Sequence, residues 1–255
     1  MKVPFVDLKP IHYELKEELN SAFEKVVFEN SNFIRGDEDI AFEKAGIIKP
    51  NCPCIVFEGY DVYRETADKN NSMLMMIAPF ADTKNLALKG IYQQENLSLT
   101  LAVIEEFFPD ISQNVIDEGL KNVQHPCRFQ YIDDKNVLID GAHNPNGVDG
   151  LVQSLNYYYP DKKIRIIFGC LKNKNYKKMV NTLATGLYYQ PEIYFYKFNH
   201  DNSVDAQTLK SCCPIESKIL NNFSDIILDN SVLTVICGSL YMIKDVAGAL
   251  NIKIF

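Results

Sequence analysis

The chain has 255 residues, of which 47% are apolar and 23% are charged, and its formal net charge is −7. This composition is typical of a globular protein, and the length allows two compact domains. The negative charge, without a basic stripe to offset it, argues against nucleic acid as a partner. No apolar run approaches the roughly 20 residues of a membrane span, and the start does not resemble a secretory signal. We therefore expect a cytoplasmic protein with no membrane partner.

Two clusters of residue types could mark a ligand site, and neither is specific. Seven cysteines are scattered without paired CxxC units, so neither a zinc site nor a disulfide framework is indicated, and reduced thiols are expected. Four lysines lie between residues 172 and 178. We interpret them as the solvated start of a helix, with a phosphate-binding groove as the alternative.

The first half of the chain predicts mainly helices. Apolar residues at helical spacing indicate an amphipathic helix over residues 11–29. A Pro-rich turn precedes a short apolar strand at 54–58, and residues 61–69 favour a helix. Two further helices are expected at 94–109, where Pro109 stops the first, and at 112–123.

From Pro126 onward, short strands alternate with helices. Residues 127–140 predict a hairpin that turns at Asp133 and Asp134. Further strands are expected at 163–170, 191–198 and 231–239, and helices at 145–159, 174–187, 203–212 and 239–250. This order predicts an α/β domain of Rossmann type, with a mostly parallel sheet covered by helices on both faces.

The corner "LIDGAHNPNG" is the strongest candidate site, because ligands in such sheets bind beyond the carboxyl ends of the strands. Asp140 at the strand end could accept hydrogen bonds from a ribose. His143 could donate to a phosphate or carboxylate, or act as a base. Alternatively, Asp140 and Asn144 only cap the helix that begins at Pro145. The corner lacks a Gly-rich dinucleotide fingerprint, so a nicotinamide cofactor is weakly supported.

Several segments together resemble one enzyme family. They are "IAFEKAGIIKPNCP" (40–53), "LKGIYQQENLSLTLAVIE" (88–105), "HPCRFQYI" (125–132), "LIDGAHNPNG" (138–147) and "ICGSLYMIKDV" (236–246). In this order they resemble the folylpolyglutamate synthase and dihydrofolate synthase family, relatives of the Mur ligases. The resemblance implies a C-terminal domain of Mur ligase type at residues 126–255, preceded at 39–125 by part of a central P-loop ATPase-type α/β domain.

The resemblance also implies a reaction, cofactors and substrates. In that family ATP phosphorylates a carboxylate of dihydropteroate or tetrahydrofolate, and the amino group of L-glutamate attacks the acyl phosphate. The site must therefore hold a phosphorylated anion, Mg²⁺ and an amine together, and charge neutralisation and positioning do most of the work. We expect an ATP-dependent, amide-forming ligase of folate metabolism that acts as a monomer.

Four residues match nucleotide or metal positions of the family. Lys44 in "EKAG" resembles a lysine whose carbamylated form helps to hold magnesium; otherwise it is a surface lysine at a helix end. Asn96 resembles an asparagine near the adenine, against the alternative of a polar residue at a helix start. Arg128 resembles an arginine that reaches ATP, and Asp140 an aspartate on the ribose.

Two further residues match the substrate side of the family's site. His143 resembles a histidine close to the transferred phosphate and the incoming glutamate. Ser239 in "GSLY" resembles a serine that contacts substrate, although Gly-Ser before a helix is also a good N-cap.

The sequence also departs from the family. No G-x-x-x-x-G-K-[ST] phosphate loop occurs in the 255 residues, and the Asp-His pair that precedes "IAFEKAGI" in the family is missing. Residues 1–38 instead resemble the start of pyridoxal-phosphate-dependent sugar aminotransferases, without that family's catalytic lysine. We therefore expect an impaired ligase, or alternatively an inactive fragment or a module that binds nucleotide or glutamate. Residues 126–255 are expected to fold independently, and residues 40–125 to be less stable.

Overall fold

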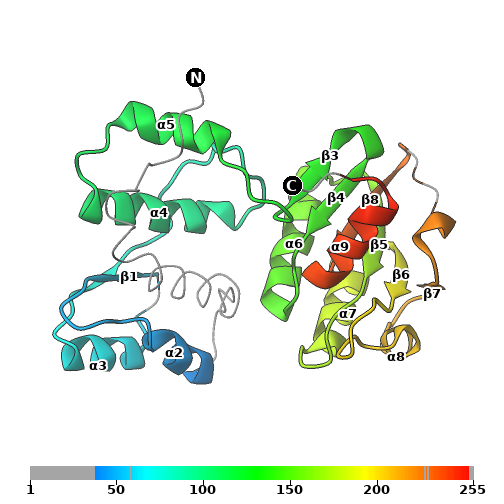
Figure 1. Ribbon diagram of the computed structural model, residues 1–255, viewed down its shortest axis with the longest axis horizontal. Coiled ribbons are helices and arrows are strands. Elements are labelled where there is room, and N and C mark those ends of the chain that lie inside the picture. Colours follow the sequence, from blue (N-terminus) through cyan, green and yellow to red (C-terminus); the bar gives the residue numbers. More distant parts are fainter. Residues whose placement is uncertain (1–37, 58, 227, 229, 253–255) are drawn as a thin grey trace. The chain divides into compact units, whose positions relative to one another are not determined.

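The structure is a computed structural model that describes residues 38–57, 59–226, 228 and 230–252 (Figure 1). The helix expected at residues 11–29 and nearly all of the aminotransferase-like segment lie outside this part. The described chain forms two compact units. The N-terminal unit comprises the residues up to Ala81 and Leu97–Asn122, and the C-terminal unit comprises Asp82–Asn96 and the chain from Val123 onward.

The N-terminal unit is mainly helical. Its elements are α2 (Glu38–Ala45), β1 (Cys54–Val56), α3 (Asp61–Lys69), β2 (Leu74–Met76), most of α4 (Gln93–Phe107) and α5 (Gln113–Asn122). The expected strand at 54–58 and the expected helices at 61–69, 94–109 and 112–123 are confirmed, whereas α2 and β2 were not predicted. The two strands pair in parallel, with Ile55 opposite Met75, and a small core of alanines with Ile48 and Tyr63 packs against them.

The C-terminal unit contains a six-stranded sheet in the order β3-β4-β8-β5-β6-β7. Its strands are β3 (Gln130–Ile132), β4 (Val137–Asp140), β5 (Lys163–Phe168), β6 (Glu192–Tyr196), β7 (Ser217–Leu220) and β8 (Val232–Cys237). Only β3 runs antiparallel, and it forms with β4 the expected hairpin through a 3₁₀ turn, η2 (Asp133–Lys135). The predicted α/β fold with a mostly parallel sheet is thereby confirmed, with β7 as a strand that was not predicted.

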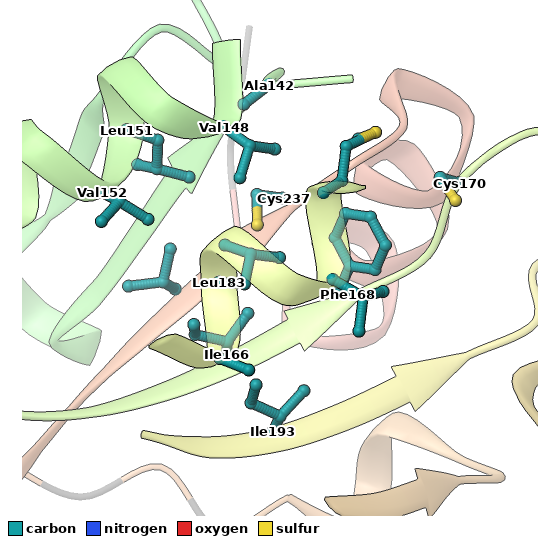
Figure 2. Packing of buried hydrophobic residues seen from close by; sticks show 14 of the residues in the cluster. Ala142, Val148, Leu151, Val152, Ile166, Phe168, Cys170, Leu183, Ile193 and Cys237 are labelled. Atoms are coloured by element: carbon teal, nitrogen blue, oxygen red, sulfur yellow. The ribbon is translucent and has the colours of Figure 1, made fainter. Parts of the chain in front are cut away.

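Helices cover both faces of this sheet. One face carries α6 (Pro145–Tyr158), α7 (Tyr176–Thr185) and α8 (Ala206–Ser211), and the other carries α9 (Leu240–Ala249) and the 3₁₀ turn η3 (Phe223–Asp225). Figure 2 shows Leu151 of α6 and Leu183 of α7 in the same apolar cluster as Ile166 and Phe168 of β5. The four predicted helices of this part are confirmed. No helix in the described part of the chain is long and apolar enough to cross a membrane.

Strand β4 lies at a change of direction in the winding of the sheet. Its residues alternate between the two cores, with Leu138 packed on the α6 side and Val137 and Ile139 on the α9 side. The helix after β4 covers one face of the sheet, whereas the helix after the neighbouring strand β8 covers the other. In open α/β sheets, ligands bind beside such a change, beyond the carboxyl ends of the strands.

Candidate functional site

The ends of β4 and β8 bring the predicted site residues of the C-terminal unit together. Asp140 pairs with Cys237 in the parallel register, so the residues that follow each of them leave the sheet side by side. A side chain added at Gly141 would meet Leu240 at 3.0 Å, which shows how closely the two strand ends approach. His143 after β4 and Ser239 after β8 are therefore placed at the same edge of the sheet.

Asp140 is the buried centre of this edge. Only 3% of its surface is exposed, and three donors of the protein contact its carboxylate. Oδ1 accepts from the Ala142 amide at 2.8 Å, and Oδ2 accepts from the Phe129 amide at 2.8 Å and from the Tyr92 hydroxyl at 3.1 Å. None of these donors belongs to α6, so Asp140 does not cap that helix.

Burial raises the pKa of the Asp140 carboxyl above its ordinary value, because the charged form loses its hydration. The amides of Phe129 and Ala142, the Tyr92 hydroxyl and the positive charge of Arg128 act in the opposite direction. A carboxylate with two oxygens has about four acceptor positions. Since the described residues supply three donors, one acceptor position on Oδ1 has no donor among them.

The helix-capping interpretation is correct for Asn144. Its side chain accepts a hydrogen bond from the Gly147 amide at 2.7 Å, and Pro145 follows as the first residue of α6. Asn144 thus satisfies a free donor at the start of the helix. The two polar residues of the corner have different tasks, because Asn144 ends the turn while Asp140 faces the loop before β3.

The loop that carries Arg128 has a strained backbone. Cys127 and Phe129 on either side adopt φ values of 61° and 46°. Residues other than glycine rarely occupy this left-handed region. Hydrogen bonds hold it there: the Cys127 amide donates to Gln130 Oε1 at 2.9 Å, and the Cys127 carbonyl accepts from the Gly141 amide at 2.6 Å. The strained backbone thus holds Arg128 between two residues in the left-handed region.

Arg128 is half-buried, and its guanidinium lies 5.7 Å from the centre of the Tyr92 ring. Within the described residues the guanidinium makes no hydrogen bond or ion pair, although its charge acts on both Asp140 and His143. A cation with unused donors beside a corner of this kind is suited to an anionic ligand.

His143 is a neutral ring with an available acceptor. Its Nδ1 lies 2.8 Å from the Gly141 carbonyl oxygen, and because a carbonyl can only accept, Nδ1 carries the proton. Burial lowers the pKa of His143 from its ordinary value of 6.5, and the positive charges of Lys174 and Arg128 lower it further, while the bond to Gly141 opposes them. Nε2 can therefore accept a hydrogen bond or a proton at neutral pH.

Ser239 occupies the N-cap position of α9 without capping it. Its residue surface is 3% exposed, its backbone is extended, and no side-chain hydrogen bond to the helix is made. The N-cap alternative for this serine is therefore not realised in the structure. The hydroxyl and the amide groups at the start of α9 stand at the same sheet edge as His143.

The lysine cluster divides into two roles. Lys172 donates to the Asp201 carbonyl at 3.0 Å, and Asn175 caps α7 through the Lys178 amide, as expected of a solvated helix start. Lys174 differs, because its charge lowers the pKa of His143. Part of the cluster thus adds positive charge to the candidate site.

Asn96 and Lys44 stand apart from this edge in the chain. Asn96 lies in the first turn of α4, within the C-terminal unit, and donates to Gln93 Oε1 at 3.0 Å. Lys44 is half-buried in the last turn of α2, in the N-terminal unit. Among the described residues, no group of three His, Cys, Asp or Glu side chains could hold a metal ion.

Sequence reasoning missed Tyr92 and Phe129, which both donate to Asp140. Both lie inside segments that carry the family resemblance, "IYQQEN" and "PCRFQ", whose matched positions are Asn96 and Arg128. The Phe129 donor is a backbone amide, which no residue type marks.

Residues 127–226 match the family model described as "Mur ligase, glutamate ligase domain". A dihydrofolate synthase/folylpolyglutamate synthase of Bacillus subtilis is 26% identical over 253 residues, which cover 84% of this chain and 58% of the relative. A folylpolyglutamate synthase of Lacticaseibacillus casei is 34% identical over 103 residues, which cover 38% of this chain and 24% of the relative. The chain thus spans less than two thirds of either relative.

Solved structures show the same fold. A bifunctional folylpolyglutamate synthase/dihydrofolate synthase from Yersinia pestis, complexed with AMPPNP and Mn ion, is 20% identical with a TM-score of 0.71, covering 87% of this chain and 58% of that one. A folylpolyglutamate synthase from Thermotoga maritima is 24% identical with a TM-score of 0.66, and the match covers 86% of this chain and 59% of that chain. The fold agrees with the resemblance found in the sequence motifs.

Proposed function

We propose that this chain is an ATP-dependent glutamate ligase. Its residues 127–226 match the Mur ligase glutamate ligase domain, and it is similar to folylpolyglutamate and dihydrofolate synthases. The reaction joins L-glutamate to a folate or pteroate carboxylate through an acyl phosphate. The observation that carries the proposal is the convergence of Arg128, Asp140 and His143 around the strained loop and the end of β4. We further propose that the protein is a cytoplasmic monomer.

Each of these groups has a task in that reaction. The remaining acceptor position on Asp140 Oδ1 suits a ribose hydroxyl, and the Arg128 guanidinium suits the phosphates of ATP. Neutral His143 can accept a hydrogen bond or proton from the attacking amine of glutamate through Nε2. The Ser239 hydroxyl and the Lys174 ammonium are the groups that we propose to hold a carboxylate of glutamate. ATP supplies the phosphoryl group that activates the acceptor carboxylate.

The described side chains do not by themselves fit a divalent cation, since no cluster of three possible ligands is present among them. We propose that Lys44, if carbamylated, would supply one ligand to a magnesium ion, which would neutralise phosphate charge. No step above depends on that ion. Asn96, at the start of α4, is the proposed neighbour of the adenine.

A second candidate follows from the missing phosphate loop. Backbone amides and a lysine of that loop normally cradle the triphosphate, and the 255 residues contain no such motif. The chain alone would then bind nucleotide or glutamate without efficient turnover. We expect this outcome for the isolated chain, with ligand binding retained at the C-terminal unit.

The test combines turnover and binding. ADP release is measured with ATP, Mg²⁺, L-glutamate and either dihydropteroate or tetrahydrofolate, and nucleotide binding is measured by calorimetry. We expect little ADP release but measurable ATP binding, weakened about tenfold or more by Arg128→Ala, because an ionic hydrogen bond contributes about 1.5–3 kcal/mol. The control Lys163→Ala removes an exposed cation at the start of β5 and should leave binding unchanged.

The possible outcomes separate the candidates. Substrate-dependent ADP release that His143→Ala abolishes would establish an active ligase and overturn the binding-module candidate. Binding without turnover would favour that candidate. Failure of the wild-type chain to bind ATP would refute both.

A further inference from the structure

The side chain of Tyr92 contacts both residues that are proposed to bind the nucleotide, Asp140 and Arg128. Its hydroxyl donates to Asp140 Oδ2 at 3.1 Å, and its ring lies 5.7 Å from the Arg128 guanidinium. Neither the motif comparison nor the proposed chemistry assigns it a role. A half-buried phenol that pairs with a buried carboxylate is a costly arrangement unless the pair is well satisfied, so its place here requires an explanation.

Tyr92 is held firmly against α6. The amide of the preceding residue, Ile91, donates to Ser154 Oγ at 3.1 Å, and this hydroxyl in turn donates to the Gly150 carbonyl at 2.6 Å. A Cβ added at Gly150 would lie 3.2 Å from Tyr92 Cδ1, so the glycine provides the space for the ring. Burial, and after it the charge of Asp140, raises the pKa of Tyr92, which keeps the phenol protonated as a donor. The ring is therefore a fixed part of the site.

The contact also determines how Asp140 is oriented. Among the described residues, Oδ2 accepts from the Tyr92 hydroxyl and the Phe129 amide, whereas Oδ1 accepts only from the Ala142 amide. Rotation of the carboxylate would break the two bonds to Oδ2. The single remaining acceptor position is thus kept on Oδ1, where a hydroxyl donor of a ligand can use it.

We infer that Tyr92 is a positioning residue for the nucleotide: its hydroxyl fixes the Asp140 carboxylate so that Oδ1 accepts a ribose hydroxyl, and its ring supports Arg128. The inference rests on the proposed function, in which Asp140 contacts the ribose. It adds a residue to that site and predicts recognition of the ribose hydroxyls.

The experiment measures the affinities of the full chain for ATP, 2′-deoxy-ATP and 3′-deoxy-ATP by calorimetry. The wild type should bind ATP about tenfold more tightly than at least one deoxy analogue, which is the size of one hydrogen bond to a charged acceptor. Tyr92→Phe removes only the hydroxyl. It should weaken ATP by about three- to tenfold and leave the affinity for that analogue unchanged, so that the discrimination is lost.

Two further variants accompany the test. Tyr188→Phe removes an equivalent hydroxyl from a side chain that is 72% exposed, and it should retain all three affinities. Gly150→Ala keeps the Tyr92 hydroxyl but displaces the ring, and it should also reduce the discrimination. If Tyr92→Phe does not fold, the discrimination between ATP and the deoxy analogues in Gly150→Ala decides whether the inference holds.

Other results would overturn the inference. Unchanged discrimination in Tyr92→Phe, or an equal loss for all three nucleotides, would leave Tyr92 a structural role only. Tighter ATP binding would mean that the phenol competes with the ribose. Wild-type binding without discrimination would refute the ribose contact while nucleotide binding stands, and absence of any wild-type binding would refute the proposed function as well.

Discussion

His143 makes the stability of the protein depend on pH in a defined direction. Its pKa is lowered below 6.5 in the folded state, chiefly by burial. Between the folded and unfolded pKa values, the unfolded chain therefore binds more protons than the folded one. The contribution of His143 to the free energy of unfolding should therefore rise with pH up to about 6.5, whereas the raised pKa of Asp140 acts in the opposite sense. Urea titrations from about pH 5 to about pH 7 measure this slope, and His143→Gln should reduce it.

The matched control for this prediction is the exposed residue His125. His125→Gln should keep the slope of the wild type. A slope that His143→Gln leaves intact would show that this ring does not change its protonation on unfolding. The assignment of His143 as a neutral ring whose Nε2 accepts a hydrogen bond would then be wrong.

At the scale of single residues, the sequence indicated the polar corner but not its burial. The motif around Asp140 and His143 was correctly placed at a strand end, because apolar runs that stop at a polar residue are visible in the sequence. The donors of Asp140 could not be predicted. Tyr92 is separated from it by 48 positions, and the strained backbone of Phe129 depends on contacts with the end of β4.

At the scale of elements, the close approach of β5 and β8 depends on glycine. Gly238 follows β8 with φ at +117°, and a Cβ there would collide with the Gly169 carbonyl oxygen. We expect Gly238→Ala to lower the free energy of unfolding by at least about 2 kcal/mol, from backbone strain and steric overlap together. Urea denaturation followed by circular dichroism measures the change.

The control lies in the helix that follows the same strand. A Cβ at Gly248 of α9 would meet nothing within 4 Å, so Gly248→Ala should stabilise the protein by about 0.5 kcal/mol through helix propensity. Equal effects of the two substitutions would contradict the tight approach of the two strand ends.

Long periodic elements were predictable, whereas two of the short strands were not. The helix at 145–159 was correct within a residue because its apolar face repeats over four turns and Pro145 marks its start. Strands β2 and β7 contain three and four residues, too few to show alternation, and they form only because a neighbouring strand supplies partners for their backbone. Topology, which decides these pairings, is not local in sequence.

At the scale of the whole molecule, the chain should open in two steps that follow its two compact units. The strands β1 and β2 of the N-terminal unit have three residues each, and Met73 and Met76 are more than half exposed, at 52% and 53%. A two-stranded sheet of this size is marginally stable, whereas the strands of the C-terminal unit are buried in two cores. Residues 54–76 should therefore exchange their amide hydrogens early.

The segment Asp82–Asn96 decides where the stable unit begins, because it precedes the expected domain start at residue 126 but belongs to the C-terminal unit. The Ile91 amide is bonded to Ser154, and Tyr92 is bonded to Asp140. Hydrogen-exchange mass spectrometry of the full chain should show residues 90–96 exchanging as slowly as β4, and Tyr92→Phe should accelerate both together. Exchange of this segment at the rate of β1 would instead mean that its contacts with α6 and Asp140 are not maintained in solution.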